Sequence, residues 1–155
     1  MPTRERLGAH QAQLYAAEAA TIAAAGRRWP RLRDAQAYLD GLIDSAWFAT
    51  QWPRLLRCTI ERRGSGSVWS TCQRLGPTGS EDFAAEGVIL VADGALTQPV
   101  VLHELAHLLA PPGAGHGPAF ADVLLTLVRH EMGFFAYAEF LHALQEAEGF
   151  GQLAR

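Results

Sequence analysis

The segment 100–109 constrains the fold of this chain more than any other, because it is almost wholly apolar yet contains two histidines and a glutamate. This composition predicts a helix that is buried on nearly all sides. Thr97 or Gln98 can cap its start, Pro99 suits its first turn, and the two prolines at 111–112 end it. Since unsatisfied polar side chains are costly to bury, the fold must provide partners for these three residues.

The three polar residues have the spacing H-E-x-x-H, formed by His103, Glu104 and His107. Positions i and i+4 of a helix lie on one face, so the two imidazoles can hold one metal ion between them. The carboxylate of Glu104, next to the first ligand, can reach a water bound to that metal. The alternative is a core helix whose histidines hydrogen-bond to the backbone.

A third histidine, His116, follows in the turn-rich segment 111–118. Pro118 is well placed to open the next helix, so the chain reverses over about eight residues and returns near the point where it left. A histidine at that point can reach the same ion, and three imidazoles on zinc leave a fourth position open for catalysis. A solvated loop histidine is the alternative, and Asp122 or Glu131 on the next helix is the alternative third ligand.

The composition is that of a soluble globular protein, with 49% hydrophobic and 19% charged residues, and we expect a single domain over residues 1–155. The net charge of −3 does not support a strong nonspecific interaction with nucleic acid. We find no apolar run long enough for a membrane span and no secretion signal, so we expect a cytoplasmic protein. The oligomeric state is not determined by the sequence.

The periodicity of apolar residues predicts five helices and three strands in the order α-α-β-β-β-α-α-α. The strands are expected at 55–63, 68–73 and 87–92, and four of the helices at 5–25, 35–48, about 118–131 and about 134–148. The helix with the H-E-x-x-H motif is expected between its cap at Thr97 or Gln98 and the prolines at 111–112. The Gly/Ser turn at 64–67 predicts a hairpin of the first two strands, in which Cys58 directly faces Cys72 as a free thiol with a structural role. Residues 88–92 are the strand expected to add an extended substrate at the sheet edge.

The chain resembles the SprT-like zinc metallopeptidases, and more closely the small actinobacterial putative metallohydrolases that are named for their H-E-x-x-H motif. The resemblance spans most of residues 5–149 and is most specific over 100–133. It rests on His103-Glu104-Leu105-Ala106-His107 followed by His116-Gly117-Pro118-Ala119-Phe120, on Glu61-Arg62-Arg63-Gly64, on Val100-Val101-Leu102 and on Met132-Gly133.

This resemblance implies a small zincin-like (minigluzincin) α+β domain, in which a three-stranded, mainly antiparallel sheet packs on the helix with the H-E-x-x-H motif, flanked by further helices. It implies that His103, His107 and His116 bind Zn²⁺, that Glu104 is the catalytic base, and that the substrate is a protein or peptide. No cysteine follows Cys72, so we do not expect the zinc ribbon of the relatives that act at DNA. We therefore do not extend DNA-directed proteolysis to this chain.

A peptidase also needs a donor that stabilises the oxyanion of the tetrahedral intermediate. Tyr137 is our candidate for this role, with His130 and Arg129 as alternatives, because helix phase does not choose among them. Two other functions remain open. One is a zinc-dependent amidase that acts on a small molecule, and the other is a non-catalytic interaction or regulatory domain in which zinc has a structural role.

Overall fold

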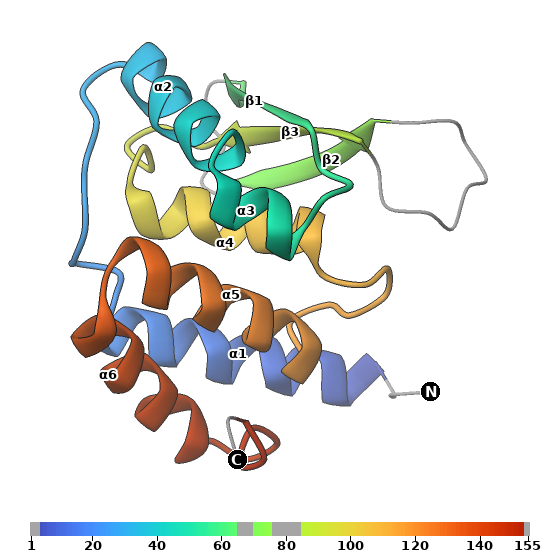
Figure 1. Cartoon of the computed structure of the whole chain (residues 1–155). Coiled ribbons are helices and arrows are strands. Elements are labelled where there is room, and N and C mark those ends of the chain that lie inside the picture. Colours follow the sequence, from blue (N-terminus) through green and yellow to red (C-terminus); the bar gives the residue numbers. More distant parts are fainter. Residues whose placement is uncertain (1–3, 65–69, 76–84, 154–155) are drawn as a thin grey trace. The chain divides into compact units, whose positions relative to one another are not determined.

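The computed structural model describes residues 4–64, 70–75 and 85–153, which contain six helices and three strands (Figure 1). They fall into two compact units, one of residues 4–26 and 110–153 and the other of the described residues between 27 and 109. The first unit contains α1 (Arg4–Ala20), α5 (Pro118–Glu131) and α6 (Phe134–Gln145). The second contains α2 (Leu32–Ile43), α3 (Ala46–Gln51), β1 (Arg57–Arg62), β2 (Thr71–Leu75), β3 (Glu86–Val91) and α4 (Gln98–Leu109).

The predicted α+β class is confirmed, and the one additional element comes from a break in the second predicted helix. Instead of one helix over 35–48, the chain forms α2 and then α3. Ser45 separates them, because its hydroxyl donates to the carbonyl of Leu42 at 2.7 Å and accepts from the backbone N–H of Phe48 at 3.2 Å. A serine that bonds to both neighbouring turns is a typical N-cap, and it ends one helix where it starts the next.

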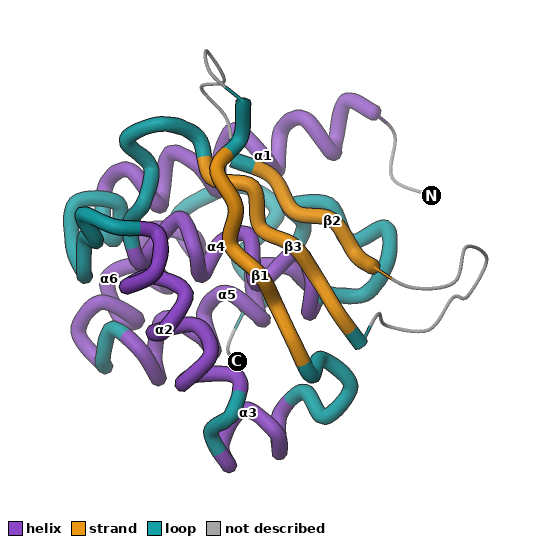
Figure 2. Tube along the Cα trace, turned by 90° about the horizontal axis from the view of Figure 1, so that it is seen from above, coloured by secondary structure: helices purple, strands orange, loops and turns teal. Residues whose placement is uncertain are grey.

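The sheet is mixed, so the predicted mainly antiparallel sheet with a β1–β2 hairpin is wrong. Figure 2 shows β3 between the other two strands. The strand β1 runs parallel to β3, and β2 runs antiparallel to it. Alternation of apolar residues predicts which face of a strand is buried but not which strand is its neighbour. The most apolar strand, β3, has taken the central position, and the two more polar strands form the edges. The predicted turn falls largely on residues 65–69, outside the described residues.

Cys58 and Cys72 are free thiols, as expected, but they do not face each other across a hairpin. Cys58 pairs with Gly87 of β3, and Cys72 pairs with Ile89 on the other side of the same strand. Two strand spacings separate β1 from β2, about 9–10 Å. A disulfide needs Cα atoms within roughly 7 Å, so these two cysteines cannot form one in this sheet.

One face of the sheet packs on α4, through β2 and β3. Along β3, every second residue points toward α4, namely Gly87, Ile89 and Val91. Their partners in register on the other strands point to the same face of the sheet. Gly87 lies so close to α4 that a Cβ atom there would be 2.6 Å from Cδ1 of Leu108. The glycine therefore sets how closely the central strand approaches the helix with the H-E-x-x-H motif.

We expect Gly87→Ala to lower the free energy of unfolding by about 1–3 kcal/mol, the usual cost of overpacking a core. Leu108 is 3% exposed and has little room to move away from the added methyl group. Urea unfolding followed by circular dichroism measures the change. Gly41→Ala is the matched control, because nothing lies within 4 Å of that position inside α2 and a helical alanine is favoured over glycine. Equal stability of Gly87→Ala and wild type would contradict this account of the packing.

In the other unit, α6 packs against both α1 and α5. The core of this unit contains buried leucines and phenylalanines that are each at most 1% exposed, among them Leu14, Phe120, Leu124, Phe140 and Phe150. A membrane-spanning helix would need a longer apolar stretch than any helix among the described residues provides.

Candidate metal centre

The start of α4 is fixed by Gln98, a buried polar residue that is 2% exposed. Its backbone N–H donates to the carbonyl of Arg27 at 2.8 Å, and its side-chain oxygen accepts from the backbone N–H of Arg27 at 3.1 Å. Its amide nitrogen also donates to the hydroxyl of Tyr38 at 3.0 Å. The side chain is thus hydrogen-bonded at both ends, and this anchors the first turn of the helix.

The last turn of α4 is tied to β2 by Arg74, whose guanidinium donates to the carbonyl of His107 at 2.8 Å. Carbonyls in the last turn of a helix have no partner within the helix, and a cation suits the negative end of the helix dipole. Since β2 and α4 are also in direct contact, this bond holds the strand alongside the helix. The helix that presents the H-E-x-x-H residues is therefore fixed near both ends.

His103 and Glu104 are each 7% exposed, and His107 is half-buried. The predicted burial of the helix is confirmed, since all its residues except Val100 and His107 are buried. The imidazole rings of His103 and His107 meet nearly edge to face, with centroids 5.0 Å apart and planes at 71°. One turn of helix has placed both rings on the same side, as the i, i+4 spacing predicts.

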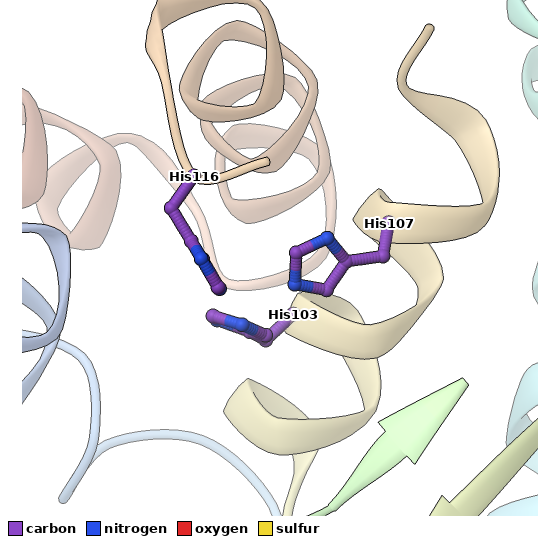
Figure 3. A group of neighbouring side chains, drawn as sticks. All are labelled: His103, His107 and His116. Atoms are coloured by element: carbon purple, nitrogen blue, oxygen red, sulfur yellow. The ribbon is translucent and has the colours of Figure 1, made fainter. Parts of the chain in front are cut away.

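His116 completes a group that could hold a metal ion: one ligand atom from each of His103, His107 and His116 lies within 4.8 Å of the others (Figure 3). Among the described residues, this is the only group of three or more histidine, cysteine or acidic side chains with such a geometry. The three imidazoles point toward one another in Figure 3. Neither Asp122 nor Glu131 belongs to the group, so the loop histidine is the third member.

The loop before α5 places His116 through two successive turns. The N–H of Ala114 donates to the carbonyl of Pro111 at 3.1 Å, and the N–H of Gly117 donates to the carbonyl of Ala114 at 3.0 Å. Gly113 and Gly115 have φ of 80° and 54°, values that residues with a Cβ atom rarely adopt. The glycines of this loop are therefore needed for its path.

Sequence reasoning missed Tyr15. Its ring meets that of His116 edge-on, with centroids 5.1 Å apart and planes at 68°. Phe120, one helical turn after His116, makes a similar contact at 5.2 Å and 71°. Phe120 could have been found from its i, i+4 spacing, because α5 begins at Pro118. Tyr15 is 101 positions away along the chain, and no local pattern connects the two residues.

The candidates for an oxyanion donor lie together near the junction of α5 and α6. The guanidinium carbon of Arg129 is 5.2 Å from the ring centre of Tyr137, and Nδ1 of His130 is 2.8 Å from Oε1 of Glu131. Arg129 follows Pro118 by eleven residues, which corresponds to about 16 Å along a helix. Because His116 precedes the other end of α5, Tyr137 contacts a residue about three turns along that helix from it, and its role as oxyanion donor stays a prediction.

Burial raises the pKa of both thiols to about 12. For Cys58, whose usual value is 9.0, burial is the main cause, followed by Cys72 and Asp40. For Cys72 burial again dominates, the carboxylate of Glu104 adds to the shift, and the guanidinium of Arg74 opposes it. The interaction with Glu104 indicates that Cys72, on β2, faces the part of α4 that contains the motif.

We therefore expect both cysteines of the folded protein to react slowly with iodoacetamide at pH 8, where a thiol of pKa about 12 is only about 10⁻⁴ ionised. The rate should rise steadily with pH. A raised thiol pKa also means that its contribution to stability is fully present below pH 9.0 and is lost as pH approaches about 12. Mass spectrometry of alkylated protein measures the rate, and the unfolded protein, with ordinary thiols, is the control. Fast labelling of the folded state at pH 8 would contradict the burial of Cys58.

Comparison with protein-family models, with curated proteins and with solved structures finds no match for this chain.

Proposed function

We propose that this chain is a zinc-dependent metallohydrolase, a cytoplasmic peptidase with a zincin-like site similar to that of the SprT-like enzymes. The observation that carries the proposal is the group of three histidines, two from one turn of a buried helix and one from the loop that follows it. The buried carboxylate of Glu104 directly follows the first of these histidines in the sequence.

The three side chains fit zinc. A tetrahedral zinc ion with Zn–N bonds of about 2.0–2.1 Å holds its nitrogens roughly 3.4 Å apart. The ligand atoms here all lie within 4.8 Å of one another, so small rotations of the imidazoles reach that spacing. Imidazole suits zinc as well as copper, iron and nickel. A set of three protein ligands leaves a fourth position for substrate or water, as in catalytic rather than structural zinc sites.

Zinc held there supplies a Lewis acid that polarises the scissile carbonyl and lowers the pKa of water toward neutrality. The residues of the chain supply the rest of the chemistry. His103, His107 and His116 hold the metal through neutral imidazole nitrogens. A carboxylate oxygen of Glu104 accepts a proton from the attacking water and then delivers it to the nitrogen of the leaving amine.

An extended peptide is the substrate that the sheet suits best, and β2 is the strand that can receive it. From the sequence we expected residues 88–92 to be the edge strand that binds the substrate. This prediction is wrong, because β3 is central and is paired on both sides. The outer edge of β1 is occupied by Gln36, whose amide donates to the carbonyl of Cys58 at 2.9 Å and accepts from the N–H of Ile60 at 2.7 Å. Within the described part of the sheet, the edge of β2 has no partner strand. A substrate strand could add there, beside the helix to which Arg74 ties β2.

The proposal is tested by measuring metal and activity in the same preparation. We expect about one zinc per chain in purified protein, and cleavage of an unfolded protein substrate such as casein that stops with a chelator and returns with added zinc. A stable protein without metal, which takes up none when zinc is supplied, would refute the proposal. Zinc without peptide cleavage would favour a structural zinc site or an amidase, and hydrolysis of small amides distinguishes these two.

A further inference from the structure

The third histidine of the candidate metal centre differs from the other two in how its side chain is held. His103 and His107 belong to a helix that is fixed near both ends by Gln98 and Arg74. His116 belongs to a loop rich in glycine and proline, in which two backbone turns fix the main chain. Backbone turns leave the χ angles of a side chain open, so the orientation of this imidazole depends on the side chains around it.

The rings of Phe120 and Tyr15 both meet that imidazole edge to face. Edge-to-face contacts are directional, because the positive edge of one ring faces the negative face of another. Phe120 lies on α5 and is 0% exposed, within the hydrophobic core of its unit. Tyr15 lies on α1 and is half-buried. The helix α1 thus supplies a contact that the loop and α5 cannot supply themselves.

A second residue of α1, His10, lies near the same loop. A Cβ atom at Gly117, directly after His116, would lie 3.2 Å from the carbonyl oxygen of Ala114 and 3.6 Å from Nδ1 of His10. His10 in turn packs on the ring of Phe150, with centroids 5.1 Å apart. The helix α1 thus approaches the loop at two neighbouring positions, near the backbone of Gly117 and on the ring of His116, and at the second it makes a ring contact.

We propose that Tyr15 is a positioning residue for the metal ligand His116. Its ring restricts the imidazole to the orientation in which the nitrogen points toward His103 and His107, so that less conformational freedom is lost when a metal binds. The strength of an edge-to-face aromatic pair corresponds to a change of about 2–10-fold in metal affinity when one ring is removed. This inference rests on the metal site of the proposed function, but it does not depend on hydrolysis.

The ring of Tyr15, rather than its hydroxyl, carries this role. The hydroxyl accepts a hydrogen bond from the side-chain amide of Gln11 at 3.3 Å, on the exposed side of the same helix. Tyr15→Phe keeps the ring and removes this hydroxyl. Tyr15→Leu removes the ring and keeps an apolar side chain. The two variants therefore separate the two parts of the side chain.

The test measures zinc affinity by competition with a chromophoric chelator. We expect the Kd for zinc to rise about three- to tenfold in Tyr15→Leu and to stay within about 1.5-fold of wild type in Tyr15→Phe. Phe135→Leu is the control for the loss of an aromatic ring, since Phe135 is 84% exposed on α6. Thermal unfolding checks that each variant folds, and Tyr15→Met, whose flexible side chain fills gaps, replaces Tyr15→Leu if the latter does not.

A second readout uses the metal-free protein. The imidazole protons of His116 should show ring-current shifts in the NMR spectrum of wild type and Tyr15→Phe, and these shifts should move toward ordinary values in Tyr15→Leu. Unchanged zinc affinity and unchanged shifts in Tyr15→Leu would overturn the inference, as would an equal loss of affinity in Tyr15→Phe. A protein that binds zinc but cleaves nothing would refute only the proposed hydrolase function and leave both readouts intact.

Discussion

Glu104→Gln is expected to lower the rate of peptide hydrolysis by about 10²–10⁴-fold, the usual contribution of a general base. The glutamine has the shape of glutamate but cannot accept the proton of the attacking water, so the chemical step fails. Glu104 is buried at 7% exposure within α4, and a residue of equal size should leave the packing of that helix unchanged. Metal content and thermal stability should therefore stay close to those of wild type.

The assay compares initial rates of cleavage at matched zinc occupancy. Glu139→Gln is the control, because Glu139 is an exposed carboxylate on α6 that lies outside the histidine group. Full activity in Glu104→Gln would exclude the role of this residue as base. A loss of zinc together with activity would instead indicate that the carboxylate helps to hold the metal.

Removing one of the three imidazoles is the second change with a large expected effect. His103→Ala and His116→Ala should each weaken zinc binding by more than about 100-fold. That figure is the upper end of the loss in affinity when a residue that only orients a ligand is removed, and the loss of a ligand itself should cost more. Two ligands remain in each variant, and two imidazoles no longer define a tetrahedral site with one open position. Activity should fall with occupancy and recover in part when excess zinc is supplied.

Zinc content after dialysis against a weak chelator measures this effect. His142→Ala serves as the control, since His142 is an exposed histidine on α6 and is not part of the group. If His116→Ala kept its zinc while His103→Ala lost it, the third ligand would have to be another residue. Asp122 is the first to test, because it lies in the first turns of α5, closer along the chain to His116 than Glu131 at the end of that helix.

Local patterns predicted the helices well, because a helix is stabilised by contacts between residues three and four positions apart. Pro118 and the apolar periodicity after it predicted α5 over 118–131, the bounds that the structure shows. The break at Ser45 was missed, although a serine three residues before Phe48 is a local signal for a helix start. The sequence also predicted the helix with the H-E-x-x-H motif and its burial, and both predictions are confirmed.

The sheet was predicted less well, because strand pairing is not a local property. The alternation over 55–63 predicts that Leu56, Cys58 and Ile60 share one face; Cys58 and Ile60 are buried, but Leu56, which precedes β1, is 69% exposed. The alternation contained no information that β3 would lie between β1 and β2, and the assumption that neighbours in sequence are neighbours in space was wrong. The same assumption led to the expected contact of Cys58 with Cys72 and to the choice of residues 88–92 as the edge strand.

The sequence by itself determined the chemistry of the candidate site. The spacing of His103 and His107 places both on one face of a helix, and a short loop keeps His116 within reach, whatever surrounds them. Only the tertiary structure decided which residues support that site. Tyr15 contacts His116 and Tyr137 lies beside Arg129 at the other end of α5, because contacts between distant parts of the chain depend on how the helices pack. Helix periodicity fixes the side on which a residue lies, but it does not fix what lies opposite.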